Sequence, residues 1–167
     1  MEHAIPALVI AAIIVVGGVV LADATRGSLE TVDESWRDIE AISEERLGTE
    51  LTVVSTDVTD GGATVTLVLG NEGRTAIAEP SYMDLIINYD GTDTERYVVW
   101  LPYTESSPPG DNEWTVDSIS GDYRNPGMFD PGEEMTIQIH LNPATDAGPD
   151  RWLVLATETG VSYNIYF

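Results

Sequence analysis

Side chains that could act as a base or a nucleophile are few in this chain of 167 residues. It contains two His and no Cys, so a thiolate nucleophile, a disulfide and a thiolate zinc site are all excluded. His3 lies in an apolar N-terminal segment, and His140 lies beside Leu141 in a predicted strand. No Ser stands in a nucleophile-elbow context, and no Gly-rich phosphate loop precedes a helix. The sequence therefore predicts that the protein is not an enzyme.

Carboxylates gathered in turns are the remaining reactive groups, and cation binding is the chemistry that they suggest. Asp90 and Asp93 fall in one turn, and Asp117 and Asp122 fall in a second acidic stretch. Calcium prefers carboxylate oxygens in loops, although neither stretch follows the EF-hand spacing. A structural Ca²⁺ or another cation on these four residues is one interpretation, and a solvated acidic turn without any cofactor is the alternative.

Acidic residues dominate the charge of the chain. It has 29 Asp and Glu against seven basic residues, all of them Arg, which gives a net charge of −22. Residues 49–167 alone hold twenty acidic residues and four Arg, a net charge of −16. Nucleic acid is excluded as a partner because phosphate binding needs a basic patch. Such a surface repels itself at low salt, so the composition suits a salt-rich or cation-rich medium.

An uncharged segment of nineteen residues runs from Ala4 to Ala22. As a helix it would span roughly 28 Å, close to the hydrocarbon thickness of a bilayer. No Lys or Arg precedes it, whereas signal peptides and single-span anchors usually carry basic flanks. One interpretation is that a basic leader is removed ahead of Met1 and the apolar segment is kept. The other is that Met1 is the initiator.

An apolar stripe extends the helical pattern beyond Ala22. Its members recur every three or four residues, as on one face of a helix: Leu29, Val32, Trp36, Ile39 and Ile42. Gly48 follows as a C-cap, so we expect one helix from Ala4 to Leu47. The stripe would contact neighbouring copies of the same helix or pack on the chain's own globular part.

From Glu50 onward the hydrophobic period becomes two, which indicates β-strands. Strands are predicted over residues 51–58, 63–70, 82–89, 96–101, 113–119, 134–141, 151–156 and 161–167. Short strands at this spacing predict an immunoglobulin-like antiparallel β-sandwich. The expected fold class is therefore α+β, with a long hydrophobic helix in residues 1–48 and a sandwich, the head, in residues 49–167. The join at Gly48-Thr49 has no flexible linker, which suits a subunit that repeats in a lattice.

Five aromatic residues fall in or beside the predicted loops between residues 97 and 131, where they can serve either the core or a subunit contact. They are Trp100, Tyr103, Trp114, Tyr123 and Phe129.

Four segments of the head resemble one family. TVTLVLGNEGRTAI contains the turn Asn71-Glu72-Gly73, and SYMDLIINYDG contains the pair Met83-Asp84. NPGMFDPGEEMTIQIHLNP contains the turn Pro131-Gly132-Glu133, and ATETGVSYNIYF closes the chain. Together with the N-terminal helix, these segments resemble archaellins, the filament subunits of the archaeal motility machine. Type IV pilins share the helix plan but carry Glu where this chain has Ile5, which argues against a bacterial-type pilin.

The resemblance implies the major structural subunit of an archaellum, exposed on the cell surface as an extracellular filament. Its partners would be other copies of itself, the membrane before assembly, and the archaellum motor platform. A membrane-anchored accessory or stator protein that binds the surface layer, or a type IV adhesion pilin, are the alternatives. The helix residues expected to make the polymer contacts are Ile5, Leu8, Val9, Ile10, Ile13, Ile14, Val16, Gly17, Gly18, Val20, Leu21, Leu29, Val32, Trp36 and Ile39.

Overall fold

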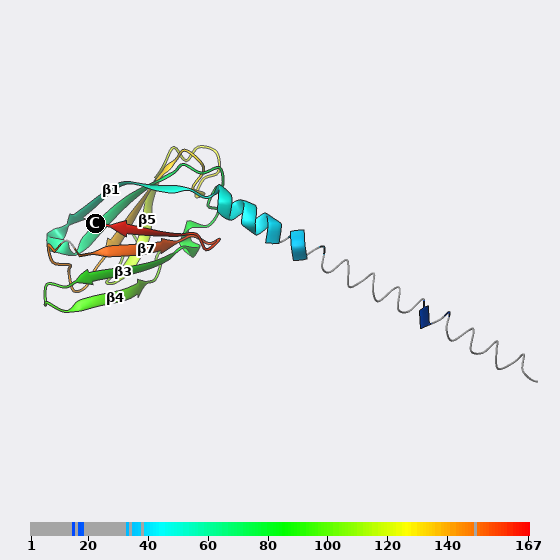
Figure 1. Cartoon of the computed structure of the whole chain (residues 1–167). Helices are drawn as coiled ribbons and strands as arrows, with labels where there is room; N and C mark the ends of the chain where they lie inside the picture. Colours follow the sequence, from blue (N-terminus) through cyan, green and yellow to red (C-terminus); the bar gives the residue numbers. More distant parts are fainter. Residues whose placement is uncertain (1–14, 16, 19–32, 34, 38, 149) are drawn as a thin grey trace, which may run out of the picture. The chain divides into compact units, whose positions relative to one another are not determined.

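A computed structural model describes residues 15, 17–18, 33, 35–37, 39–148 and 150–167 of the chain. The head consists of two antiparallel sheets of four strands each, in the orders β1-β2-β6-β5 and β4-β3-β7-β8 (Figure 1). The strands are β1 (Leu51–Thr59), β2 (Thr64–Asn71), β3 (Asp84–Asp90), β4 (Arg96–Leu101), β5 (Glu113–Ser120), β6 (Glu134–His140), β7 (Trp152–Ala156) and β8 (Ser162–Tyr166). The predicted antiparallel sandwich is confirmed.

The core lies between the two sheets and follows the period-two pattern of the sequence. Alternate residues of β2 and β6 face inward from one sheet, and alternate residues of β3 and β7 face inward from the other. Leu67 pairs across the first sheet with Ile137, and Leu85 pairs across the second with Leu155. All four side chains are fully buried, so hydrophobic burial fixes which face of each strand points inward.

The aromatic residues around the loops divide into core and surface groups. Trp114 and Phe129 are fully buried, and Tyr103 packs edge-on against Trp114 with ring centroids 5.0 Å apart. Trp100 and Tyr123 are 57% and 93% exposed. The hydrophobicity of these residues does not by itself distinguish the buried ones from the exposed ones.

The turn between β1 and β2 is the predicted Asp60-Gly61-Gly62, which forms the short 3₁₀ helix η1 (Asp60–Gly62). Gly61 and Gly62 have φ angles of +65° and +97°, which favour glycine. A Cβ on Gly62 would also collide with the carbonyl of Thr145, so glycine is required there for space as well.

The start of β3 is a correction to the predicted strand over residues 82–89. Residues Pro80–Tyr82 form a 3₁₀ turn, η2, in which the Tyr82 and Met83 amides donate to the Glu79 and Pro80 carbonyls. The strand begins only at Asp84 because these amides are already paired inside the turn.

Residues 39–48 form a helix, and the other described residues before them are helical as well. Most of the predicted helix from Ala4 to Leu47, including Ile5 to Ile14, Val16 and Val20 to Val32 of the expected polymer contacts, lies outside the described residues. Gly17, Gly18, Trp36 and Ile39 are described, and all four are exposed. In the described part of the chain, no helix has both the length and the apolar character needed to span a membrane.

The chain divides into two compact units, Met1–Ser43 and Glu44–Phe167. The last helical residues, 44–48, therefore belong to the same unit as the sandwich.

Candidate functional site at the end of the helix

The last helical turn is closed by Thr49, which is 8% exposed. The Thr49 amide donates to the Arg46 carbonyl at 3.2 Å, and its hydroxyl donates to the Glu45 carbonyl at 2.9 Å. These bonds satisfy two of the carbonyl groups that the end of any helix leaves without an intrahelical partner. The helix thus ends at a defined residue.

Gly48 has a different role from the C-cap that the sequence predicts. Its φ angle is not in the left-handed range that a glycine C-cap adopts. Instead, a Cβ at this position would collide with the Thr75 hydroxyl. Gly48 is needed because a loop of the head passes directly against the end of the helix.

That loop is the Asn71-Glu72-Gly73 turn, which follows β2 and binds the end of the helix through backbone groups. The Gly48 carbonyl accepts from the amides of Arg74 at 2.8 Å and Thr75 at 3.2 Å. The Glu50 carbonyl accepts from the amides of Glu72 at 2.9 Å and Gly73 at 3.0 Å.

Gly73 allows this approach because it has no side chain. A Cβ on Gly73 would lie 2.6 Å from the Glu50 nitrogen and would collide with the Gly48 carbonyl. Both atoms belong to the backbone, so neither can swing aside as a side chain can.

Asn71 holds the loop in this conformation and is itself 1% exposed. Its amide nitrogen donates to the carbonyls of Thr75 at 3.0 Å and Phe129 at 2.9 Å. Its side-chain oxygen accepts from the Gly73 amide at 3.1 Å. Both amide protons and the oxygen are thereby paired, as a buried amide requires.

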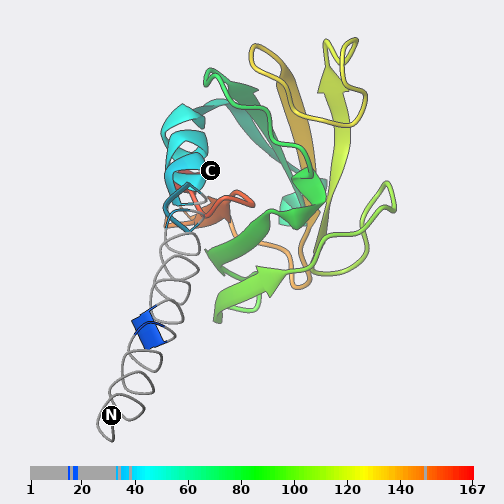
Figure 2. The same cartoon turned by 90° about the vertical axis from the view of Figure 1, so that its right-hand side faces the viewer.

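The end of the helix is also bound by the turn after β7 and by β8, which lie beside it in Figure 2. The Arg46 guanidinium donates to the Thr159 carbonyl. The Tyr163 hydroxyl accepts from the Leu51 amide at 3.1 Å and donates to the Thr49 carbonyl at 3.2 Å. The end of the helix is therefore hydrogen-bonded to both sheets. The contacts to one sheet are made through the loop after β2, and those to the other are made through β8 and the turn before it.

The sequence indicated only part of this site. The Asn71-Glu72-Gly73 turn and the absence of a linker were both visible in it. Arg46, Thr159 and Tyr163 were missed, because their bonds join positions more than a hundred residues apart in sequence. The inward position of Tyr163 in the alternation of β8 was the one available signal.

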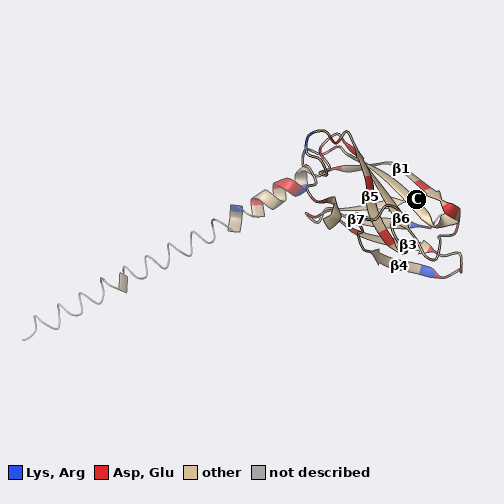
Figure 3. Ribbon diagram, turned by 180° about the vertical axis from the view of Figure 1, so that it is seen from behind, with Lys and Arg blue, Asp and Glu red and all other residues tan. Residues whose placement is uncertain are grey.

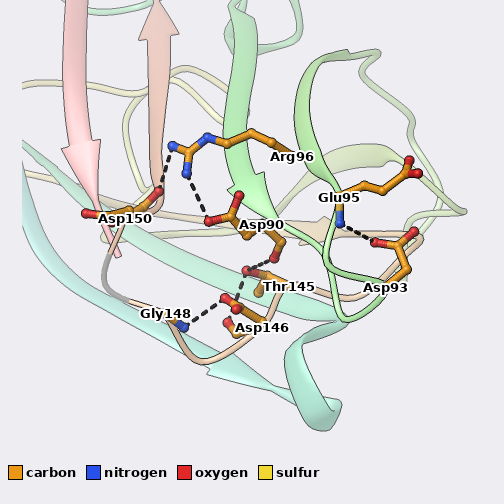
Figure 4. A network of polar contacts seen from close by, with 8 residues as sticks. All are labelled: Asp90, Asp93, Glu95, Arg96, Thr145, Asp146, Gly148 and Asp150. Carbon is orange, nitrogen blue, oxygen red and sulfur yellow. Dashed lines mark hydrogen bonds and ion pairs between the residues drawn. The ribbon is translucent and has the colours of Figure 1, made fainter.

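The four candidate metal ligands lie in separate local networks. Asp90 pairs with Arg96 at 3.0 Å, and Arg96 also donates to the Asp150 carbonyl at 3.0 Å (Figure 4). Asp93 accepts from the Tyr97 hydroxyl at 2.6 Å and from the Glu95 amide at 3.1 Å.

The second pair of candidate ligands is also bound within the chain. Asp117 accepts from the Ser107 hydroxyl at 3.0 Å, and Asp122 accepts from the Gly127 amide at 2.9 Å. Among the described residues, no three His, Asp or Glu side chains form a group that could hold a metal ion. The cation site stays a prediction from sequence.

Asp93 and Tyr97 are coupled electrostatically by their hydrogen bond. The bond to Asp93 raises the pKa of the Tyr97 hydroxyl to about 12. The same bond, together with the Glu95 amide, lowers the pKa of the Asp93 carboxyl. Each group is stabilised in the protonation state that it has at neutral pH.

We predict that Asn71→Asp destabilises the head by about 3 kcal/mol or more, because it removes two donors and places a buried charge against two carbonyl groups. The measurement is urea denaturation of the full chain, followed by tryptophan fluorescence. Asn164→Asp makes the same chemical change at an exposed strand position and serves as the control. Equal denaturation midpoints for both variants would contradict the role assigned to Asn71.

We predict that one tyrosine ionises near pH 12 and that Asp93→Asn returns it toward the ordinary value of 10. The pKa is raised in the folded chain, so the stability from this bond is present below pH 10 and is lost as the pH rises through about 12. Ultraviolet absorbance titration of the native and D93N proteins measures the tyrosine pKa values, and the Tyr97→Phe variant identifies which transition belongs to Tyr97. Identical titration curves for the native and D93N proteins would refute the coupling.

No protein-family model and no curated protein sequence matches the chain. Among solved structures, the archaellum periplasmic stator protein FlaG from Sulfolobus acidocaldarius matches with a TM-score of 0.53 and 21% identity. That match covers 71% of this chain and 99% of that one. A chain of the archaellum periplasmic stator protein complex FlaF and FlaG from the same organism matches with a TM-score of 0.50 and 22% identity, over 71% of this chain and 89% of that one.

The archaeal flagellum of Methanospirillum hungatei strain JF1 matches over more of the chain. Its subunit has a TM-score of 0.59 and 15% identity, and the match covers 96% of this chain and 88% of that one. These neighbours are structural components of the archaellum and not enzymes. The chain therefore has a fold that the archaellum uses both in its filament and in its stator.

Proposed function

We propose that this chain is the filament subunit of an archaellum, polymerised through its N-terminal helix with the acidic head outside. The single observation that carries the proposal is that the last helical residues are hydrogen-bonded directly to the sandwich. Bonds to the loop after β2, to Thr159 and to Tyr163 fix residues 46–50, and only Thr49 and Glu50 separate the helix from β1.

A direct connection between helix and head suits a helical lattice. Every subunit in a filament must present its head at the same place relative to its helix, so variation at the join would accumulate as disorder in the lattice. A tethered receptor module, in contrast, benefits from a flexible linker that lets it search for a partner.

The apolar residues of the N-terminal segment support the same function. Trp36 and Ile39 are 66% and 58% exposed, and Ile42 continues their spacing with 48% exposure. An exposed apolar stripe of this kind marks a contact surface. The uncharged stretch from Ala4 to Ala22 would hold the subunit in the membrane first and then pack against other copies in the filament core.

Exchange of lipid for protein gains little from hydrophobic burial, since lipid is as apolar as the helix itself. Close packing of small residues such as Gly17 and Gly18 would supply the attraction. Return of the helix to water would cost roughly 0.8 kcal/mol for each exposed CH₂ group, so the assembled filament would be hard to dissociate.

The stator subunit is the second candidate function. The match to FlaG covers 99% of the matched chain, and its TM-score differs little from that of the filament subunit. A stator subunit would use the helix as an anchor and would form discrete complexes with a surface-layer partner. A stator role does not need the last helical residues to be bound to the sandwich, whereas a lattice benefits from it.

Electron microscopy of material sheared from cells that produce this chain, with mass spectrometry of the main band, tests the proposal. We expect filaments whose principal protein is this chain, with the Ala4–Ala22 segment retained. Discrete particles that stay in the membrane fraction would reject the filament role and favour the stator.

We predict that the filament is less stable at low ionic strength. The heads carry a net charge of −16 each, and their repulsion extends over about 10 Å at 0.1 M salt and farther in dilute buffer. Melting of isolated filaments, followed by light scattering, should shift to higher temperature as NaCl is added. A melting temperature that does not change between low and high salt would contradict this view of the head surface.

A further inference from the structure

The two sheets of the head present very different outer faces. Cross-strand pairing places the outward residues of the β4-β3-β7-β8 sheet in two central rows. One row is Trp100, Ile86, Val154 and Asn164, and the other is Val98, Asn88, Trp152 and Tyr166. Six of these eight side chains are apolar or aromatic, and none is charged.

The outer side chains of these rows reach solvent: Val98 is 64% exposed, Trp100 is 57% exposed and Tyr166 is 73% exposed. Asn88, Trp152 and Val154, on the two central strands, are partly buried. Residues directly opposite each other on neighbouring strands have Cβ atoms about 5 Å apart, so the rows form one continuous surface. We call these eight residues the apolar face.

The outer face of the β1-β2-β6-β5 sheet is polar by comparison. Its central rows, read from the same kind of pairing, are Asp57, Thr66, Gln138 and Thr115, and Ser55, Val68, Thr136 and Ser118. Thr115 is buried, and the other seven are partly or fully exposed. Short hydroxyl and amide side chains are typical of a sheet face in contact with water. One head therefore carries one face suited to water and one that is not.

The apolar face also differs from the rest of the head in its lack of charge. Acidic segments are distributed along the strands and loops of the head, with few basic ones among them (Figure 3). On the outer side of β3, however, the only carboxylates are at the two ends. Asp84 accepts a hydrogen bond from the Trp100 indole at 3.1 Å, and Asp90 is paired with Arg96.

We propose that the apolar face is a lateral contact with the head of a second copy of this chain. The inference rests on the proposed filament function, which brings many copies of the head together. Heads with a net charge of −16 repel one another across most surfaces, and they can approach closely only where carboxylates are absent. The apolar face is such a surface, and its aromatic side chains are of the kind that carry interface energy.

The size of the apolar face suits this contact. An aromatic side chain buries ~150–250 Å² when it is fully covered. A standard interface takes ~800 Å² from each partner. Two Trp, one Tyr and three aliphatic side chains supply the centre of such an interface, and Asp84, Asp90 and Arg96 lie at its rim.

Single-cysteine labelling tests the proposal, because the native chain contains no Cys. Val98→Cys and Tyr166→Cys place a thiol at opposite edges of the apolar face, on β4 and β8. Ser118→Cys places one on the exposed polar face of β5 and is the matched control. The rate of maleimide labelling of the full chain is measured by mass spectrometry on intact cells, in purified filaments, and in detergent over a range of protein concentrations.

We expect labelling of V98C and Y166C in filaments to be at least about tenfold slower than in dilute detergent-solubilised chain, since a covered thiol reacts only when the contact opens. The rate in detergent should fall as protein concentration rises, and S118C should react equally fast throughout.

Four results would overturn the proposal. Filaments in which V98C and Y166C still react at the rate of the dilute chain would reject the contact but leave the filament function intact. Protection that is independent of protein concentration would mean that detergent or the chain itself covers the face. Protection on cells that is lost in purified filaments would indicate a different surface protein. If neither filaments nor associated species form under any condition, the filament function itself fails, and the contact fails with it.

Discussion

The end of an α-helix leaves its last carbonyl groups without partners inside the helix, and they must be paired elsewhere. In this chain the carbonyls of Glu45 and Arg46 are paired with Thr49, those of Gly48 and Glu50 with the loop after β2, and that of Thr49 with Tyr163 of β8. This requirement ties residues 45–50 to both sheets at once.

Two glycines and one asparagine make this arrangement sterically feasible. Gly73 brings the loop backbone against the backbone of Gly48 and Glu50, and Gly48 leaves room for the side chain of Thr75. Asn71 uses its whole amide group to hold the loop that makes the approach. A small set of residues therefore determines how the loop after β2 meets the end of the helix, and the remaining residues of the loop contribute through their backbones.

The pattern of the sequence was sufficient for the strands but not for the site. All eight strands of the described region were predicted within two residues at their starts, because each buries alternate residues and ends at a turn rich in Gly, Pro, Asn or Asp. Tyr82 was assigned to a strand because hydrophobicity cannot distinguish a 3₁₀ turn from a strand end. Trp100 is exposed and Trp114 is buried because the two side chains lie on different faces of their sheets. Which face each occupies is set by pairing between distant segments.

Most bonds at the join use main-chain atoms, so the side chains of Glu50, Glu72 and Arg74 are free to change without loss of those bonds. Sequences can therefore diverge almost completely around this join while its geometry persists. Only scattered positions, namely the two glycines, the buried asparagine and the bridging tyrosine, retain a chemical constraint. Two proteins built on this join can share few identical residues, and overall identity is then a poor guide to their common architecture.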